Sequence, residues 1–154
     1  MKRNKREKNQ KTPLVLLPRK FKSMLSAIQK FISKREPIVF EDSKIPVWLS
    51  KISPIEISAL SFACFVFARG KMNKTTRRHE TIHYHQQLEL LFVFHWVLYA
   101  LFWLVGLVRY RSPELAYREN PFEREAYSNA KKTTYLDKRP LWNWRHYIKS
   151  NEKV

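Results

Sequence analysis

The strongest constraint on this fold is a metal-binding pattern that runs directly into a long apolar segment. The pattern is HETIH, His79 to His83, and the apolar segment is Leu88–Val108. As a continuous helix, this segment would rise about 32 Å, which is enough to cross the hydrocarbon core of a bilayer. Most acidic residues downstream of the pattern lie beyond the segment. A metal site with ligands from both before and after the apolar segment therefore requires the chain to turn back.

His79, Glu80 and His83 form the pattern HExxH. On a helix, residues four positions apart lie on the same face, so both imidazoles can bind one Zn²⁺ ion. Glu80 follows the first histidine and is placed to take a proton from a water at the metal. The pattern predicts a zinc site with His79 and His83 as ligands and Glu80 as the catalytic base.

A catalytic zinc site needs a third protein ligand and leaves the fourth position for water. Helical geometry argues against Glu89, which is rotated by about 240° from His83. Glu119 and Glu123 lie four positions apart and can share a helical face, whereas Glu125 is rotated from both. Spacing alone leaves the third ligand open among the glutamates at 114, 119, 123 and 125.

The two stretches HETIHYHQQ and NPFEREAY together resemble the gluzincin metallopeptidases, in which a glutamate from a second helix joins the HExxH helix. They are most similar to small bacterial membrane-associated proteins that pair HExIHxxQQLELL with AYRxxxFEREAY. The resemblance covers about Ile55 to Tyr135. It implies a minimal zincin-like core, Zn²⁺ as cofactor, Glu123 as the third ligand, and Ala126 as the small residue that lets the second helix approach. Tyr127 departs from the pattern, because many gluzincins have an aspartate there that orients a ligand histidine.

Other polar residues near the motifs are candidates for supporting roles. Gln86 lies three positions past His83, near the metal face, where it can bind substrate or pack against the second helix. We expect His85 not to be a ligand, because it is rotated by about 200° from His83. His95 is expected to be hydrogen-bonded in place. The second-shell or substrate-binding candidates are Gln86, Asn120 and Tyr127, and the candidate oxyanion stabilisers are Tyr84, Tyr117 and Tyr127.

The apolar segment conflicts with a shared zinc site if it simply spans a membrane, because His83 and Glu123 would then lie on opposite sides. Basic residues flank both of its ends: 77 and 78 before it, 109 and 111 after it. This balance gives no positive-inside asymmetry and favours both ends on the cytoplasmic side. We expect the chain to reverse near Phe94–Val97, as a hydrophobic helical hairpin that dips into the membrane or folds into the protein. A hydropathy analysis is expected to report a transmembrane helix in either case.

The charge of the chain points to an anionic partner. Lysine and arginine outnumber aspartate and glutamate by 30 to 13, for a formal charge of +17. Because the apolar residues are concentrated in two segments, we expect anionic membrane lipids as the partner and no nucleic acid. Cys64 is the single cysteine, so the chain can form neither an internal disulfide nor a cysteine-based zinc site. The N-terminal apolar run is too short for a signal peptide, which predicts the inner (cytoplasmic) membrane with the site facing the cytoplasm.

The segments along the chain predict a mainly α fold with a short β element, in the α+β class. Residues 1–17 form a basic, disordered arm, and 18–36 form a basic amphipathic helix. Its apolar stripe suits either the membrane surface or the core of the protein. Residues 37–150 form a membrane-associated zincin-like domain. Within it we expect a loop with short extended pieces at 37–54, one buried strand at Leu60–Ala68, a helix capped by Thr75 or Thr76, and a helix at about 120–133.

These observations favour a membrane-associated zinc metallohydrolase, and among hydrolases a peptidase with a peptide or protein substrate. Two alternatives remain. In the first, the zinc site is structural or inactive, which Tyr127 favours slightly. In the second, HExxH is accidental and the chain is a single-pass membrane protein with a basic cytoplasmic arm.

Overall fold

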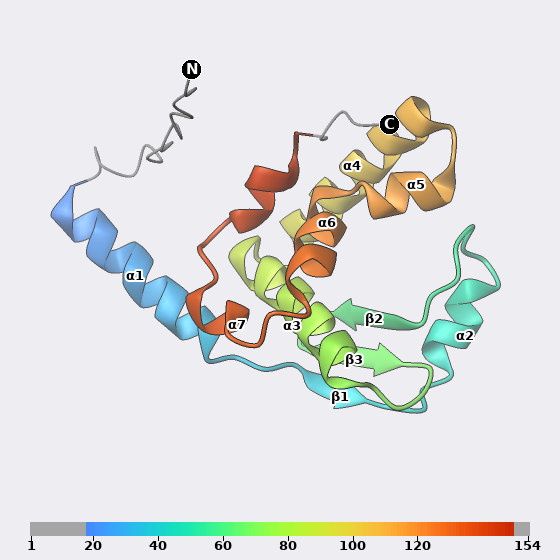
Figure 1. The fold of residues 1–154 in the computed structure, drawn as a ribbon, viewed down its shortest axis with the longest axis horizontal. Coiled ribbons are helices and arrows are strands. Elements are labelled where there is room, and N and C mark those ends of the chain that lie inside the picture. The colour runs from blue at the N-terminus through green and yellow to red at the C-terminus, as the bar shows by residue number, and fades with distance from the viewer. Residues whose placement is uncertain (1–17, 150–154) are drawn as a thin grey trace, which may run out of the picture.

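The computed structural model describes residues 18–149, so the predicted arm at 1–17 lies outside the described residues. The chain is mostly helical with a small three-stranded mixed sheet, which confirms the predicted mainly α class with a β element (Figure 1). The elements are α1 Arg19–Ser33, β1 Ile38–Phe40, α2 Ile45–Ser50, β2 Ala59–Phe62, β3 Phe65–Ala68, α3 Lys74–Glu89, α4 Val93–Tyr110, α5 Pro113–Arg118, α6 Pro121–Asn129, α7 Tyr135–Lys138 and the 3₁₀ helix η2 Asn143–Tyr147.

The sheet has the strand order β1-β3-β2, with β1 parallel and β2 antiparallel to the central strand β3. The prediction of one strand over Leu60–Ala68 is wrong, because the chain reverses at Ala63 and forms a hairpin. Ala63 has φ 52°, and its amide donates to Gln87 Oε1 at 2.9 Å. This reversal uses no glycine, proline, asparagine or aspartate, the residues that usually mark turns. A side chain 24 positions away supports a turn that local sequence does not reveal.

The segment at 37–54 contains strand β1 but also the short helix α2, so the prediction of a loop with extended pieces is only partly right. Pro46 lies in the first turn of α2, where a missing backbone N–H costs no helical hydrogen bond. Ser50 Oγ donates to the Pro46 carbonyl at 2.8 Å and accepts from the Ile57 amide at 2.9 Å. These bonds hold α2 against the segment that enters β2.

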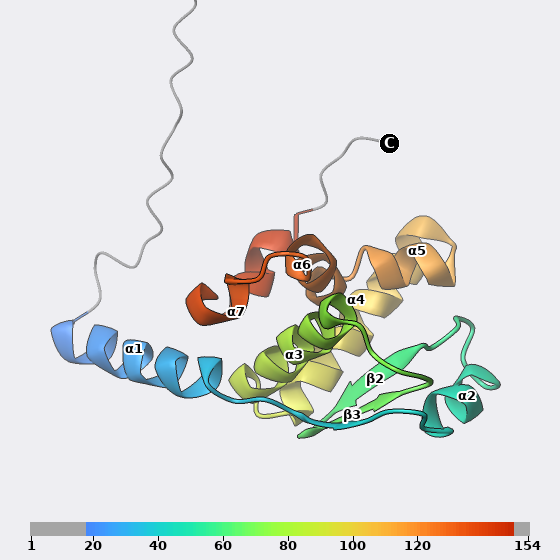
Figure 2. The same cartoon turned by 60° about the horizontal axis from the view of Figure 1, so that its bottom comes forward.

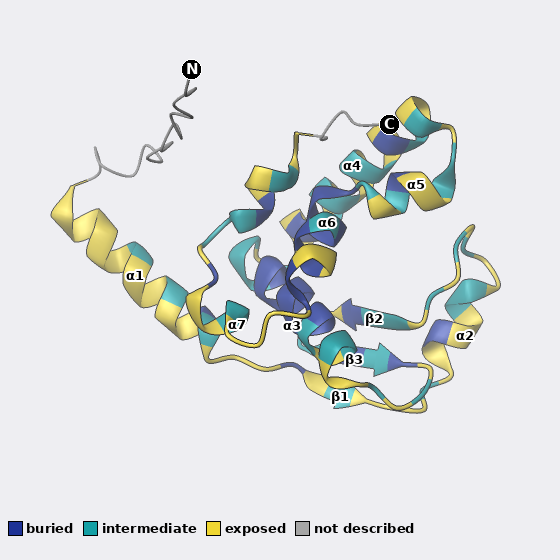
Figure 3. Ribbon diagram, in the orientation of Figure 1, coloured by how far each residue is buried: buried dark blue, intermediate teal, exposed yellow. Residues whose placement is uncertain are grey.

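Helix α3 carries the HExxH pattern through the centre of the molecule. Its cap is Asn73, not Thr75 or Thr76, because Asn73 Oδ1 accepts from the amides of both threonines at 2.9 and 2.8 Å. Asparagine is as good an N-cap as threonine and lies one position before the first helical residue. Every residue from His79 to Gln87 is buried, and Figure 3 shows the buried residues concentrated in α3 and α6.

The chain reverses between α3 and α4 at Leu91 and Phe92, which have φ of 50° and 59°. The chain therefore does reverse, but the predicted break at Phe94–Val97 is wrong, because the turn precedes an apolar segment that forms one helix and not a hairpin. Left-handed backbone is rare for leucine and phenylalanine, so only tertiary packing can keep this turn. The Phe92 amide donates to the Gln87 carbonyl at 2.7 Å, which ties the turn to the end of α3. Helix α4 is then continuous, and it is long and apolar enough to cross a membrane by length and composition.

A second reversal follows α4 and brings α5 back alongside it. Arg111 adopts a left-handed conformation with φ 51°, and Ser112 caps α5 by accepting from the Leu115 amide. Gly106 of α4 lies against Ala116 of α5, and a Cβ built at Gly106 would lie 2.9 Å from Ala116 Cα. Helix α5 was not among the elements expected from the sequence. Figure 2 shows α5 beside the C-terminal end of α4, with α6 returning toward α3.

Helix α1 is present within the predicted range 18–36, but it extends away from the rest of the fold (Figure 1). Of its stripe, only Ile32 is buried, and the large apolar residues at 21, 24, 28 and 31 are exposed. Gln29 Nε2 donates to the Arg139 carbonyl at 3.0 Å and fixes the C-terminal half of the helix. The alternative that the whole stripe packs on the core therefore does not hold.

Candidate metal centre

His79, His83 and Glu123 form a buried group in which the three ligand atoms converge. The Nε2 atoms of His79 and His83 lie 3.0 Å apart. Glu123 reaches them from α6, with Oε2 at 3.3 Å from His79 Nε2 and Oε1 at 3.3 Å from His83 Nε2. Each side chain is at most about one-tenth exposed. The chain thus brings together two segments that the apolar helix α4 separates in sequence.

These distances are close to those expected around a bound metal ion. With zinc bonds of about 2.0–2.2 Å, neighbouring ligand atoms of a tetrahedral site lie about 3.3–3.5 Å apart. The observed 3.0, 3.3 and 3.3 Å are close to those edges. Within residues 18–149, Glu123 Oε2 is buried and has no hydrogen-bond partner, as expected of a ligand atom. The group could hold a metal ion.

The electrostatics of the group follow from burying opposite charges together. Burial by itself would lower the pKa of His83, but the adjacent Glu123 carboxylate raises it to about 9. Burial would raise the pKa of Glu123, but His83 and His79 hold it well below its ordinary value. In the metal-free protein a proton on His83 thus balances the carboxylate, and a cation can replace that proton.

A chain of hydrogen bonds behind His83 fixes its orientation. His83 Nδ1 lies 2.8 Å from Gln86 Oε1, and Gln86 Nε2 donates to Glu125 Oε2 at 2.9 Å and to the Phe122 carbonyl at 3.1 Å. Glu125 accepts in turn from Arg139 Nε at 2.7 Å. Because Gln86 Oε1 can only accept, it selects the Nδ1–H form of His83 and leaves Nε2 toward the triad. Of the two roles predicted for Gln86, the structure favours the supporting one.

His79 is supported by an aromatic ring and not by a hydrogen-bonding carboxylate, because Tyr127 occupies the position beside it. The Tyr127 ring packs edge-on against His79, with 4.6 Å between the ring centroids at 65°. The Tyr127 hydroxyl lies 3.4 Å from that of Tyr117, so the two phenols pair with each other. Tyr127 restricts the His79 ring by packing, and it remains half-exposed at the edge of the site.

Two further contacts connect the apolar helix α4 with the site. Tyr99 Oη donates to Glu123 Oε1 at 2.9 Å, a contact that sequence analysis missed because Tyr99 lies inside the apolar segment. Asn120, predicted as a second-shell or substrate residue, joins α4 to α6. Its Nδ2 donates to the Tyr99 carbonyl at 3.1 Å, and its Oδ1 accepts from the Phe122 amide at 3.2 Å. The start of α6, and with it Glu123, is thereby positioned against α4.

The remaining histidines and glutamates lie outside the triad. His85 Nε2 donates to the Arg35 carbonyl, 2.9 Å away, on the other side of α3. Glu89 and Glu125 both pair with Arg139. His95 is buried, and neither ring nitrogen has a hydrogen-bond partner among the described residues, so the expectation of a hydrogen-bonded histidine is wrong. The tight packing of aromatic rings around it, including Phe122 at 4.6 Å, explains its position.

A cavity of about 500 Å³ opens onto the triad. Glu80 lines it beside His79 and His83, and burial raises the pKa of Glu80, whereas the two histidines act in the opposite direction. Apolar and aromatic side chains form much of the remaining wall: Ile57, Leu60, Trp96, Tyr99, Tyr117 and Tyr127. The cavity thus joins a candidate metal centre, a buried carboxylate and an apolar surface large enough for a side chain.

Comparisons with protein-family models, with curated proteins and with solved structures found no match for this chain. The resemblance to gluzincins is therefore supported only as far as the buried His79, His83 and Glu123 group, which is consistent with an HExxH-plus-glutamate zinc site.

Proposed function

We propose that the protein is a zinc-dependent hydrolase that cleaves peptide bonds at the His79–His83–Glu123 centre. The observation that carries the proposal is the convergence of these three ligands on a cavity whose wall also holds Glu80. Two imidazoles, one carboxylate and space for a water are the composition of catalytic zinc sites. Structural zinc sites are usually closed by four protein ligands, so an open fourth position favours catalysis.

The residues of the chain divide the chemistry between them. When bound, zinc supplies Lewis-acid activation of water and of the carbonyl under attack. Glu80 takes the proton from the attacking water and can deliver it to the leaving amine. A carboxylate whose pKa is raised by burial, as for Glu80, is a stronger base than one in bulk water. Gln86 holds His83, and Tyr99 holds Glu123, in the orientation the ligands require.

A peptide substrate is supported by the position of β2, an edge strand that lines the cavity through Ala59 to Ser61. An extended peptide can pair with the free side of an edge strand. Strand β3 is central and pairs on both sides, so it offers no free edge to a peptide. The aromatic cavity wall favours an apolar substrate side chain close to the bond that is cleaved.

Incubating the zinc-loaded protein with a quenched-fluorescent peptide library tests the proposal. We expect cleavage beside apolar residues by the wild type and a loss of at least a thousandfold in Glu80→Gln, which keeps its zinc because Glu80 is not a ligand. Glu119→Gln is the control, since Glu119 is partly exposed and lies outside the cavity lining. Equal turnover in Glu80→Gln and wild type would refute the role of Glu80.

The second candidate is a zinc-binding protein without hydrolytic activity. The observation that favours it is that Tyr127, rather than a carboxylate, supports the His79 ring. Stoichiometric zinc in wild type, lost in His79→Ala, together with no cleavage of any library peptide, would select this candidate over the hydrolase.

A further inference from the structure

Helix α4 exposes an apolar face along its whole length. Five residues spaced by four, four, three and four positions fall within an arc of about 80° on the helix. Their exposed fractions range from 51% to 82%, and no charged residue lies among them: Val93, Val97, Leu101, Leu104 and Val108. A helix on the surface of a water-soluble protein usually turns polar residues to solvent. A continuous apolar face of this length indicates contact with an apolar partner.

The packing of α5 argues against α4 crossing a bilayer. Because Gly106 lies against Ala116, α5 follows α4 back toward its middle, where Asn120 Nδ2 donates to the Tyr99 carbonyl. Glu114 and Arg118 of α5 are exposed along this stretch. If α4 spanned the membrane, these ionised side chains would enter the hydrocarbon core, at a cost of about 2.5 kcal/mol or more each.

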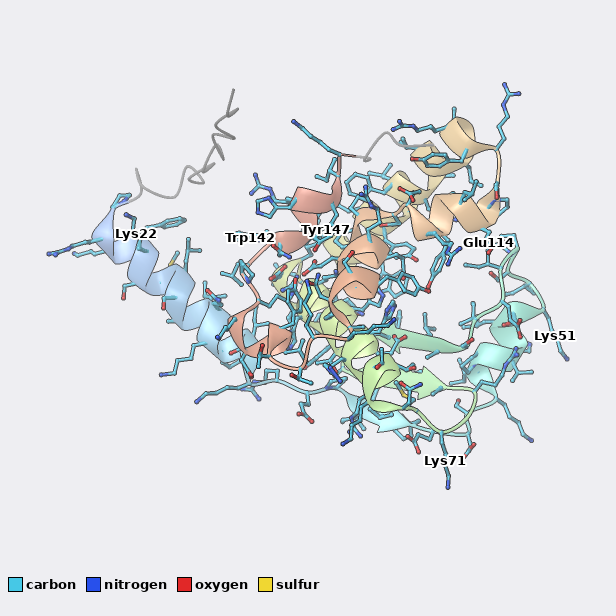
Figure 4. All side chains as sticks on the ribbon, viewed as in Figure 1. Lys22, Lys51, Lys71, Glu114, Trp142 and Tyr147 are labelled. Atoms are coloured by element: carbon cyan, nitrogen blue, oxygen red, sulfur yellow. The ribbon has the colours of Figure 1, made fainter. Side chains whose placement is uncertain are left out.

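The charge of the chain decides between lipid and a second copy as the partner of this face. Two copies would each bring a formal charge of +17, whereas an anionic bilayer attracts that charge. Exposed Arg109 and Arg111 lie at the C-terminal end of α4, and Figure 4 shows Lys51 and Lys71 projecting from the edges of the molecule. Helix α1 adds a second exposed apolar stripe among lysines. Apolar faces combined with basic surroundings are typical of proteins that bind a membrane interface.

We infer that α4 lies in the plane of an anionic bilayer surface, with the face from Val93 to Val108 in the lipid and α5 on the water side. His95 and Tyr99, on other faces of α4, line the cavity, so the metal centre stays outside the hydrocarbon. The placement accounts for a helix that has the composition of a transmembrane span but whose opposite face lines the cavity with His95, Trp96 and Tyr99. It does not depend on the proposed hydrolase activity.

Depth measurements on vesicle-bound protein test the inference. In a Cys64→Ser background, single cysteines at Val93, Leu101 and Val108 carry an environment-sensitive fluorophore, and lipids with quenchers at different depths report its position. With vesicles rich in phosphatidylglycerol, we expect all three probes at the same shallow depth, about 5–10 Å into the headgroup and acyl boundary. A Leu101 probe at the bilayer centre with shallow Val93 and Val108 probes would show a spanning helix and overturn the inference.

Paired charge substitutions test the face itself. Val97→Glu with Leu104→Glu should weaken vesicle binding at least tenfold, because both residues enter the lipid. Ile45→Glu with Ile52→Glu is the control, since it adds the same two negative charges at exposed apolar positions away from α4. Zinc content should be unchanged in both. Equal loss in the two variants, or equal binding of wild type to vesicles of phosphatidylcholine alone, would overturn the inference. So would a dimer in solution that only the α4 variant dissociates.

Discussion

Gln86 holds His83 from three positions along the same helix, with 2.8 Å between Gln86 Oε1 and His83 Nδ1. The amide nitrogen of Gln86 is committed to Glu125 and to the Phe122 carbonyl, both on α6. The orientation of the glutamine is therefore set by the helix that supplies Glu123. Gln86 thus links the orientation of the His83 ring to the packing of α6 against α3.

Gln86→Leu should lower zinc affinity by about 10- to 100-fold, because removal of a partner of a ligand histidine typically has an effect of that size. The variant should also shift the His83 ring toward a mixture of tautomers. Chelator competition measures the affinity, and ¹⁵N NMR of the imidazole reports the tautomer.

Gln87→Leu is the matched control for this prediction. Gln87 is equally buried, but it bonds to Ser61 and Ala63 of the β2 hairpin rather than to the triad. We expect a loss of stability with little change in the tautomer. If both variants lowered zinc affinity equally and left the tautomer of His83 unchanged, Gln86 would have no specific role.

Zinc binding should release a proton from His83. Glu123 raises the pKa of His83 to about 9, so at pH 7 the metal-free protein carries that proton, and zinc needs the neutral imidazole. Affinity should therefore rise with pH toward 9, by up to about tenfold per unit for one proton. Calorimetry in buffers of different ionisation enthalpy counts the protons released. Glu123→Gln removes the charge that raises the pKa of His83, so NMR titration of the metal-free variant should show a lower pKa for that ring, and an unchanged pKa would contradict the assignment.

Arg139→Leu should reduce the free energy of unfolding by about 3–5 kcal/mol, because it leaves the buried carboxylates of Glu89 and Glu125 unpaired. The Arg139 side chain is 2% exposed, and both glutamates are fully buried. Arg69→Leu breaks an ion pair with Glu56, which is 72% exposed, and should change stability by about 1 kcal/mol or less. Urea unfolding measures the stability of both variants. Similar losses of stability would show that Arg139 and its two glutamates are not desolvated in solution.

The parts of the fold that sequence predicted are those with a local pattern. The spacing of His79 and His83 placed both on one helical face, and the motif resemblance identified Glu123, which the structure brings to them. The stripe at 18–36 predicted α1, and the proline-led segment at 120–133 predicted α6.

The parts that were missed depend on contacts between distant segments. Ala63, Leu91 and Phe92 turn the chain with positive φ although none is a turn-forming residue, because packing and the side chain or carbonyl of Gln87 hold them there. Tyr99 could be recognised as a partner of Glu123 only once the chain was known to reverse on both sides of α4 and bring α6 beside it. No local pattern carries that information.

Gly106 offers a test of whether the chain folds back along α4. Whether Gly106→Ala raises or lowers the free energy of unfolding depends on whether α5 packs against α4. In an isolated spanning helix, Gly106→Ala should be neutral or stabilising by about 1 kcal/mol, since alanine has the higher helix propensity. In this fold, the new Cβ would lie 2.9 Å from Ala116 Cα, and backbone cannot yield as a flexible side chain does. We therefore expect a loss of about 1–3 kcal/mol in the free energy of unfolding.

Gly70→Ala is the natural control for Gly106→Ala, because the nearest atom to its new Cβ is Asp42 Oδ1 at 4.0 Å. This substitution should be neutral or slightly stabilising, by up to about 1 kcal/mol, through reduced freedom of the unfolded chain. Unfolding both variants in detergent and in buffer measures the difference. Because α5 also leads the chain to Asn120 and Glu123, the destabilised Gly106→Ala protein should bind zinc more weakly as well. A more stable Gly106→Ala protein with unchanged zinc affinity would mean that α5 does not pack against α4. Glu123 would then reach His79 and His83 through a different arrangement of the chain.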